Sequence, residues 1–135
     1  MILVIGEALI DLIENRYQPG AFNAIVGGAN ANVALALARR GASHAFYARM
    51  SRDRFGDIIR KRLDDNGVLY GNSVITDDNS TLAIVSLNEA GSPTYSFYVD
   101  GTADWGWTPS ELPTNEQLAH MGVKCIQFGC LTMAM

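Results

Sequence analysis

The sequence lacks the features that would indicate a metal-binding, membrane-spanning or secreted protein. Its 135 residues include two cysteines, Cys125 and Cys130, which are too few and too widely spaced for a redox or zinc motif. No apolar run reaches the roughly 18 residues of a membrane span. No basic segment precedes an apolar stretch and a small-residue cleavage site, so we expect no secretory signal. A reduced, cytoplasmic protein is the resulting expectation.

Positive charge is also scarce. Ten Lys and Arg residues stand against 14 Asp and Glu residues, for a net charge of −4. The one dense basic run, 60–62, is followed by Asp64 and Asp65. A nucleic-acid surface needs a basic face, so neither nucleic acid nor a membrane is expected as a partner.

The local patterns that are present indicate an α/β protein. Hydrophobic residues make up 48% of the chain and charged residues 18%, which is typical of a compact domain with a core. Apolar runs at 2–6 and 44–50 predict strands, and helical spacing predicts helices over 31–40 and 55–63. A strand, a helix and a strand in succession favour a βαβ unit and a parallel sheet.

Residues 72–100 have a different character. Three β-rich segments, 72–76, 80–88 and 94–100, are separated by turn-forming residues without a helix. We interpret them as a small β meander inserted into the βα framework. A capping-box pattern at 114–117 predicts a short helix after this flap.

The glycine-asparagine loop at Gly27 and Gly28 is a candidate binding site. A phosphate-binding P-loop would need Lys and Ser or Thr at a fixed spacing, which the sequence lacks. A dinucleotide fingerprint would need three glycines after the first strand, where Gly6 stands alone. Both chemistries are therefore excluded by spacing.

Asn30 and Asn32 favour a neutral, hydroxyl-rich ligand instead. A side-chain amide both donates and accepts hydrogen bonds, so it suits a hydroxyl in either role. The adjacent glycines leave the backbone open to close approach. The alternative is that one of the two asparagines is simply the N-cap of the helix that follows.

Asp11 is a carboxylate inside the apolar segment ALIDLI. It either points to solvent from a half-exposed strand or lies in a pocket that supplies hydrogen-bond donors. An unpaired buried carboxylate costs several kcal/mol, and sugar hydroxyls are suitable donors. Alternation places it on the same face as Leu9 and Ile13, and both readings stay open.

Taken together, the segments GEALIDLIE, GGANANVALALARRGA and MSRDRFGD resemble the N-terminal half of the ribokinase-like (PfkB) carbohydrate kinases. The flap sequence PTYSFYVDGTAD is similar to the fructokinase branch. The resemblance implies an α/β fold, a Rossmann-like parallel sheet with flanking helices that is incomplete, plus a small inserted β-sheet lid. The lid strands are expected at about 12–26 and 71–101, and the C-terminal nucleotide-binding half is expected to be absent from 1–135.

The resemblance also assigns roles to residues. In this family a strand aspartate, the double glycine and the signature asparagine hold the sugar, and they match Asp11, Gly27, Gly28 and Asn32. The lid closes over the sugar and often pairs with another subunit, so we expect a homodimer. Phe97 is the candidate to pack against the sugar ring, although ordinary lid core is an equal alternative.

Further positions in the lid and in the glycine-asparagine loop can be compared with the family pattern. By alternation, Tyr95 and Val99 share a lid face with Phe97. Asn30 stands where the signature usually has a small residue or proline, so we expect it either to reshape the loop or to add a hydrogen bond to the sugar. Relatives acting on acidic sugars tend to place an arginine where Val99 stands, which favours an uncharged sugar such as fructose.

The catalytic residue implied by the resemblance is missing. The family takes its base and anion hole from a Gly-Ala-Gly-Asp motif, and no such motif occurs in 1–135. We therefore expect ATP and Mg²⁺ to serve the complete enzyme, with no catalytic residue, metal or cofactor site and no turnover in this chain. The expected function is the sugar-binding half of a fructokinase-like kinase. The alternatives are a ribose or nucleoside kinase of the same family, or a non-catalytic dimerising module.

Overall fold

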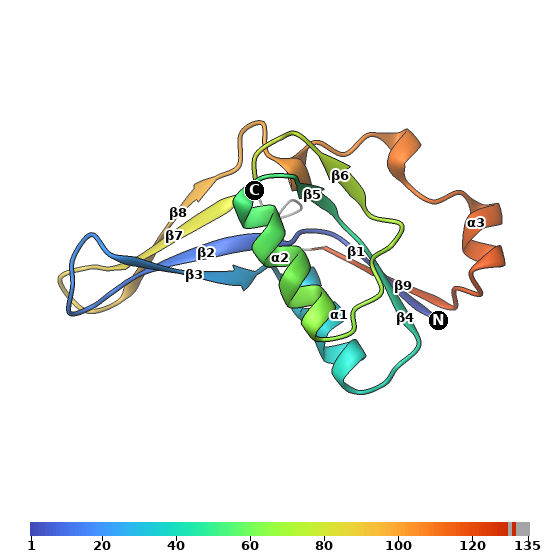
Figure 1. Cartoon of the computed structure of the whole chain (residues 1–135), viewed down its shortest axis with the longest axis horizontal. Helices are drawn as coiled ribbons and strands as arrows, with labels where there is room; N and C mark the ends of the chain where they lie inside the picture. Colours follow the sequence, from blue (N-terminus) through green and yellow to red (C-terminus); the bar gives the residue numbers. More distant parts are fainter. Residues whose placement is uncertain (130, 132–135) are drawn as a thin grey trace.

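The computed structural model describes residues 1–129 and 131. It has an α/β body with a β-sheet that extends from it as an arm, at the left of Figure 1. Helices α1 (Ala29–Arg39) and α2 (Arg54–Asp65) lie between the arm and the short helix α3 (Asn115–His120) at the opposite end.

The body sheet has the strand order β4-β1-β9, and both pairings are parallel. Its strands are β1 (Ile2–Ile5), β4 (His44–Tyr47) and β9 (Cys125–Phe128). The expected βαβ unit is therefore present, with α1 between β1 and β4 in the chain.

Helices cover both faces of the body sheet. Alternation sends Val4 and Phe46 into the core that they share with α1 and α2. It sends Leu3 and Tyr47 to the other face, where partly buried residues of the α3 region pack against them. Burial on both faces explains why β1 and β4 read as continuous apolar runs.

Helix boundaries follow ordinary capping signals. The side chain of Asp53 accepts the N–H of Gly56 at 2.7 Å and caps α2. Thr114 and Gln117 form the predicted capping box at the start of α3.

The arm is a four-stranded sheet with the order β3-β2-β7-β8, referred to below as the lid sheet. Its strands are β2 (Leu9–Glu14), β3 (Phe22–Gly27), β7 (Leu82–Leu87) and β8 (Pro93–Tyr98). The two hairpins β2-β3 and β7-β8 are antiparallel, and β2 pairs with β7 in parallel. The α/β fold with an added β-sheet is thus confirmed.

The first segment of the expected meander is not in the lid sheet, so that part of the prediction is wrong. Strand β6 (Val74–Thr76) pairs in parallel with β5 (Arg49–Ser51) in a separate two-stranded sheet. The expected strand 44–50 is broken at Ala48, whose N–H is taken by Ser73 Oγ at 3.0 Å and whose carbonyl accepts Val74 N–H at 2.9 Å. The chain changes partner at this residue, so one apolar run becomes two strands.

Two 3-10 turns, Ala103–Trp105 and Pro109–Glu111, connect the lid sheet to α3. Among the residues described, no helix is long and apolar enough to cross a bilayer.

Candidate functional site

The strand register places Asp11 in a row that crosses the lid sheet. The row runs Ile25, Asp11, Ala83, Phe97, one residue from each strand. Directly paired residues project from the same face of a sheet, and this face is called the Asp11 face below. The rings of Tyr95 and Phe97 stack at a centroid distance of 6.0 Å, which confirms that these two residues share a face.

The Asp11 carboxylate is only partly buried, yet no residue in the described part of the chain neutralises it. It has no hydrogen-bond or ion-pair partner there, and burial raises its pKa. Asp11 is half-buried, a position that fits both readings, a side chain pointing to solvent from a half-exposed strand and a carboxylate in a pocket. A desolvated carboxylate with free acceptor positions is suited to receive hydrogen bonds from a ligand.

The glycine pair lies directly against this carboxylate. A methyl group at Gly27 would overlap Asp11 Oδ2 and would approach Leu9 Cδ1 at 3.2 Å. Gly28 has a φ of +101°, and a Cβ there would lie 2.7 Å from the carbonyl oxygen of Glu7. Both positions therefore need glycine, one for space and the other for backbone conformation as well.

Glu7 holds the start of α1 and was not identified from the sequence. It is 3% exposed. Its Oε1 accepts the N–H of Ala29 at 2.9 Å, and its Oε2 accepts the side-chain amide of Asn30 at 2.6 Å. A carboxylate is favoured at a helix N-terminus because the unsatisfied N–H groups there carry partial positive charge. The one local feature of the sequence that could have indicated this role is the position of the acid, directly after the glycine at the end of the first predicted strand.

The N-cap reading of the two asparagines is wrong, because Gly28 occupies the N-cap position of α1 and no side chain caps it. Asn30 is fully buried, and its amide nitrogen donates to Glu7 and to the carbonyl of Gly129. Its Oδ1 has no partner within the described residues. Asn30 thus ties the helix start to the end of β9.

Asn32 is exposed, one helical turn beyond the glycine pair. Its backbone N–H donates to the carbonyl of Gly28 at 3.0 Å, so the two residues are about 6 Å apart along the helix axis. Gly27 contacts Asp11, and Asn32 lies on the first turn of the helix that follows the glycine pair.

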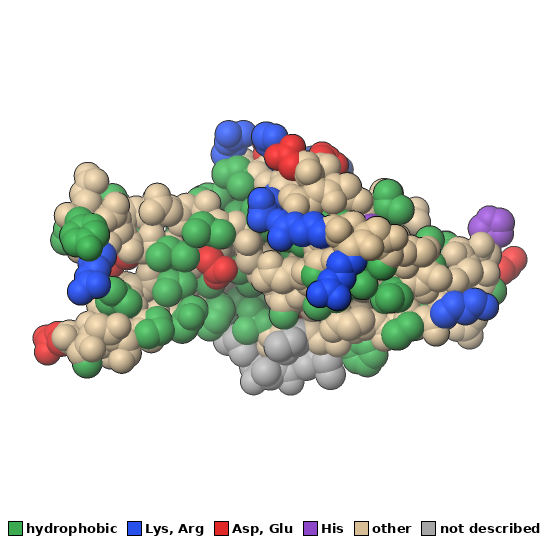
Figure 2. Space-filling model, turned by 90° about the horizontal axis from the view of Figure 1, so that it is seen from below, with side chains coloured by type: hydrophobic (Ala, Val, Ile, Leu, Met, Phe, Trp, Pro, Cys, Tyr) green, Lys and Arg blue, Asp and Glu red, His purple; other side chains and the backbone are tan. Residues whose placement is uncertain are grey.

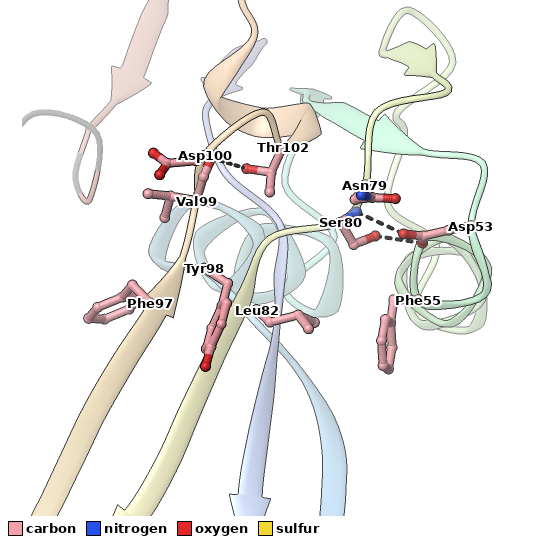
Figure 3. A pocket seen from close by; sticks show the side chains of 10 residues that line it. All are labelled: Asp53, Phe55, Asn79, Ser80, Leu82, Phe97, Tyr98, Val99, Asp100 and Thr102. Carbon is pink, nitrogen blue, oxygen red and sulfur yellow. Dashed lines mark hydrogen bonds between the residues drawn. The ribbon is translucent and has the colours of Figure 1, made fainter.

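A cavity of about 470 Å³ lies on the opposite face of the lid sheet, against the start of α2 (Figure 3). Leu82 pairs with Tyr98, so both project away from the Asp11 face. Figure 3 shows Phe97 and Tyr98 leaving β8 in opposite directions. Leu82 and Tyr98 thus line the cavity from the face opposite to Asp11, whereas Phe97, in the row of Asp11, also borders it at the edge strand β8.

Asp53 links α2 to the lid at one wall of that cavity. Its carboxylate accepts the N–H of Ser80 at 2.8 Å and the Ser80 hydroxyl at 2.7 Å. Desolvation acts to raise the pKa of Asp53, but the hydrogen bonds from Ser80 and Gly56 outweigh it, and the pKa is lowered. No group of His, Cys, Asp and Glu in the described part of the chain could hold a metal ion.

The body, the lid and the loop between them together define a ribokinase-like architecture. A parallel α/β sheet leads directly into a β lid, and the glycine pair at the start of α1 meets an acid on the lid. Comparison of sequences agrees, since residues 1–130 match the model of the pfkB family carbohydrate kinases. The chain belongs to this family.

Individual relatives are fructokinases. The chain is 36% identical over 137 aligned positions to a fructokinase of Rhizobium leguminosarum bv. trifolii, covering 98% of this chain and 40% of that protein. A Xylella fastidiosa fructokinase with bound ATP superimposes with a TM-score of 0.76 at 36% identity, over 83% of this chain and 34% of that one. A Vibrio cholerae O395 fructokinase in a fructose-, ADP- and calcium-bound form gives a TM-score of 0.71 at 31% identity, over 84% and 36%. The chain thus spans about 35–40% of the length of the curated relatives reported for it.

Proposed function

We propose that this chain is the sugar-binding part of an ATP-dependent carbohydrate kinase of the fructokinase type. The observation that carries the proposal is the Asp11 carboxylate, which is partly desolvated, unpaired among the described residues and in contact with Gly27. The similarity to fructokinases over most of the chain supports fructose as the sugar.

Each candidate residue has a role that fits a polyol. Asp11 accepts hydrogen bonds from sugar hydroxyls, because a carboxylate offers only acceptors. Gly27 and Gly28 allow a hydroxyl to approach the backbone, and the Asn32 amide serves a further hydroxyl. Phe97, across Ala83 from Asp11, packs against the apolar C–H face of the ring.

Asn30 contributes indirectly in this proposal. Its amide nitrogen is held by Glu7 and Gly129, so only Oδ1 is left for the added hydrogen bond considered above. By holding the first turn of α1, Asn30 positions the glycine pair for the ligand.

The complete enzyme would transfer the γ-phosphoryl group of ATP to a sugar hydroxyl. Mg²⁺ neutralises charge on the phosphates in such reactions. The share of this chain is to bind the acceptor sugar, orient it and cover it with the lid sheet. We propose the cytoplasm as the compartment, since ATP is available there. Because Val99 is uncharged, it offers no cationic partner for the carboxylate of an acidic sugar, which favours an uncharged sugar.

Calorimetric titration of the 135-residue chain with fructose tests the proposal. Wild type should release heat on binding fructose. Asp11→Asn should raise the dissociation constant by about tenfold or more, because a hydrogen bond to a charged group contributes about 1.5–3 kcal/mol. Asp57→Asn, which alters an exposed acid in α2, is the matched control. Identical traces for wild type and Asp11→Asn would contradict the assignment. Ribose and adenosine, titrated in parallel, separate fructose from the sugars of a ribose or nucleoside kinase.

We also propose that the lid sheet forms a homodimer. Large hydrophobic side chains remain exposed on its Asp11 face, with exposed fractions of 38–58%: Ile13, Ile25, Leu87, Tyr95 and Phe97. Figure 2 shows hydrophobic side chains gathered over the arm. Exposed apolar surface of this kind is usual at contacts between proteins.

A further inference from the structure

A buried polar cluster lies where the lid sheet joins the body, and none of the roles proposed above uses it. It consists of Thr81, Thr102 and Asp104, with exposed fractions of 1%, 6% and 2%. Thr81 immediately precedes β7, whereas Thr102 and Asp104 follow β8. The cluster therefore joins the two ends of the β7-β8 hairpin.

The three residues form a chain of oxygen–oxygen contacts. Asp104 Oδ1 contacts the hydroxyl of Thr81, which lies 2.5 Å from the hydroxyl of Thr102. The Thr102 hydroxyl in turn lies 2.7 Å from the carbonyl oxygen of Val99. Each contact is close enough to require a hydrogen between its two oxygens.

Counting hydrogens shows which form of Asp104 completes this chain. Three contacts need three protons, and the two threonine hydroxyls supply two, since a hydroxyl has one O–H. A carbonyl oxygen can only accept, so Thr102 donates to Val99. If Asp104 is ionised, Thr81 donates to its Oδ1, and no hydrogen is left for the Thr81–Thr102 contact. A neutral Asp104 donates its own O–H to Thr81, so that the Thr81 hydroxyl can donate to Thr102.

The surroundings of Asp104 favour the neutral acid. Its Oδ2 is buried without a partner in the described part of the chain, which costs less for a neutral acid than for a charged carboxylate. Desolvation raises the pKa of Asp104 to about 6 and outweighs the hydrogen bonds from Thr81 and Thr102, which act to lower it; the charge of Glu7 acts in the same direction as desolvation. Arg49 donates to the carbonyl of Ala103 at 2.9 Å but is paired with Asp78 and Glu111.

The chain of hydrogen bonds ends on the strand that carries the proposed sugar contact. Val99 follows β8 directly and is two residues from Phe97. At the other end, the carbonyl of Thr81 accepts the N–H of Ile10 at 3.1 Å, next to Asp11 on β2. The cluster thus touches the base of both strands whose side chains face the proposed sugar.

We propose that Asp104 is a positioning residue that, as a neutral acid, donates the proton that completes the Asp104–Thr81–Thr102–Val99 chain and sets the lid for sugar binding. The part concerning the sugar rests on the proposed function. When Asp104 loses its proton, one contact has no hydrogen, the two threonine oxygens repel, and β8 shifts relative to β2. Sugar affinity then falls as the pH rises through the titration of Asp104.

The first test follows the ¹³C chemical shift of the Asp104 side-chain carboxyl in the wild-type chain, which needs no substitution. The expected titration midpoint is near 6, whereas a midpoint near 3.8, the ordinary pKa of an aspartate, would overturn the proposal. This measurement involves no sugar, so it decides the protonation state even if fructose does not bind. A complete lack of fructose binding would count against the proposed function alone.

The second test compares variants by fructose titration and by hydrogen exchange of the β8 amides at about pH 5 and about pH 7.5. In wild type the affinity for fructose should be up to about 30-fold lower at the higher pH. This factor is the decrease in the protonated fraction of Asp104 between the two pH values for a titration midpoint near 6. Asp104→Asn should keep the higher affinity and β8 protection at both values, because its amide donates to Thr81 at any pH. Asp100→Asn, an exposed acid in the same segment, should behave as wild type. An Asp104→Asn chain with the pH dependence of wild type would refute the proposal.

Discussion

At the residue scale, the site depends on small side chains beside a carboxylate. Gly27 leaves the space that Asp11 Oδ2 occupies, and Gly28 adopts a φ of +101° that brings the loop against Glu7. Glu7 in turn holds the first turn of α1 through Ala29. The position of the proposed sugar contact is therefore set by residues that need not touch the sugar.

Gly27→Ala should abolish measurable fructose binding while the chain remains folded. The added methyl group would displace the Asp11 carboxylate, and the backbone at this position has no positive φ that would strain an alanine. Calorimetry measures the binding, and far-ultraviolet circular dichroism checks the fold.

Gly71→Ala is the matched control, because a Cβ there meets no atom within 4 Å. Retention of wild-type affinity by Gly27→Ala would contradict the contact between this glycine and the ligand-binding carboxylate.

At the element scale, α2 and the lid are connected through one side chain. Asp53 caps α2 through Gly56 and accepts two hydrogen bonds from Ser80, which precedes β7. A helix terminus and the base of a lid strand therefore share one carboxylate. The lid is thereby anchored on the face opposite to Asp11.

Asp53→Ala should lower the free energy of unfolding by about 2 kcal/mol, since it removes an N-cap and leaves the Ser80 N–H unpaired. Urea denaturation measures the change. Because the pKa of Asp53 is lowered in the folded state, its stabilisation is present above the ordinary aspartate pKa of 3.8 and is lost as the pH falls through the folded-state pKa. The variant should therefore lose less stability than wild type on acidification.

Asp57→Ala is the control for this helix, since Asp57 is exposed and its one ion pair among the described residues is with Arg60, one turn away. Asp57→Ala should change the free energy of unfolding by no more than about 0.5 kcal/mol. Equal destabilisation by the two substitutions would show that neither the N-cap bond to Gly56 nor the Ser80 bonds contribute to stability.

At the scale of the whole molecule, the lid sheet exposes apolar side chains on the face that also carries Asp11. A second copy of the chain packed on the distal part of this face would bury Ile13, Leu87 and Tyr95 and would leave the row from Ile25 to Phe97 for the ligand. The lid would then serve both to cover the sugar and to join two subunits.

Sedimentation velocity tests the dimer. Wild type should sediment as a dimer at micromolar concentrations, and Tyr95→Lys should shift it to monomer, because a lysine charge would be buried in the contact. Tyr17→Lys is the control, since Tyr17 is 90% exposed in the hairpin turn. A wild-type chain that sediments as a monomer across the range would contradict the proposed dimer.

The sequence alone was sufficient for the features that local patterns encode. Apolar runs and helical spacing predicted the strands and helices of the body, and the resemblance indicated the family and the added lid. Asp11 and the glycine pair stood out because a charged residue in an apolar strand and paired glycines before a helix are local anomalies. Each of these signals lies within a few residues of chain.

Only the tertiary structure decided which residues meet. Strand pairing brought Phe97 to the same row as Asp11, although 86 residues separate them, and it moved 72–76 from the lid to a pair with β5. The roles of Glu7 and Asp104 depend on which groups, distant in the sequence, form hydrogen bonds with these buried carboxyl groups. Pairing partners and burial are long-range properties that depend on the packed chain as a whole, so neither periodicity nor composition could predict them.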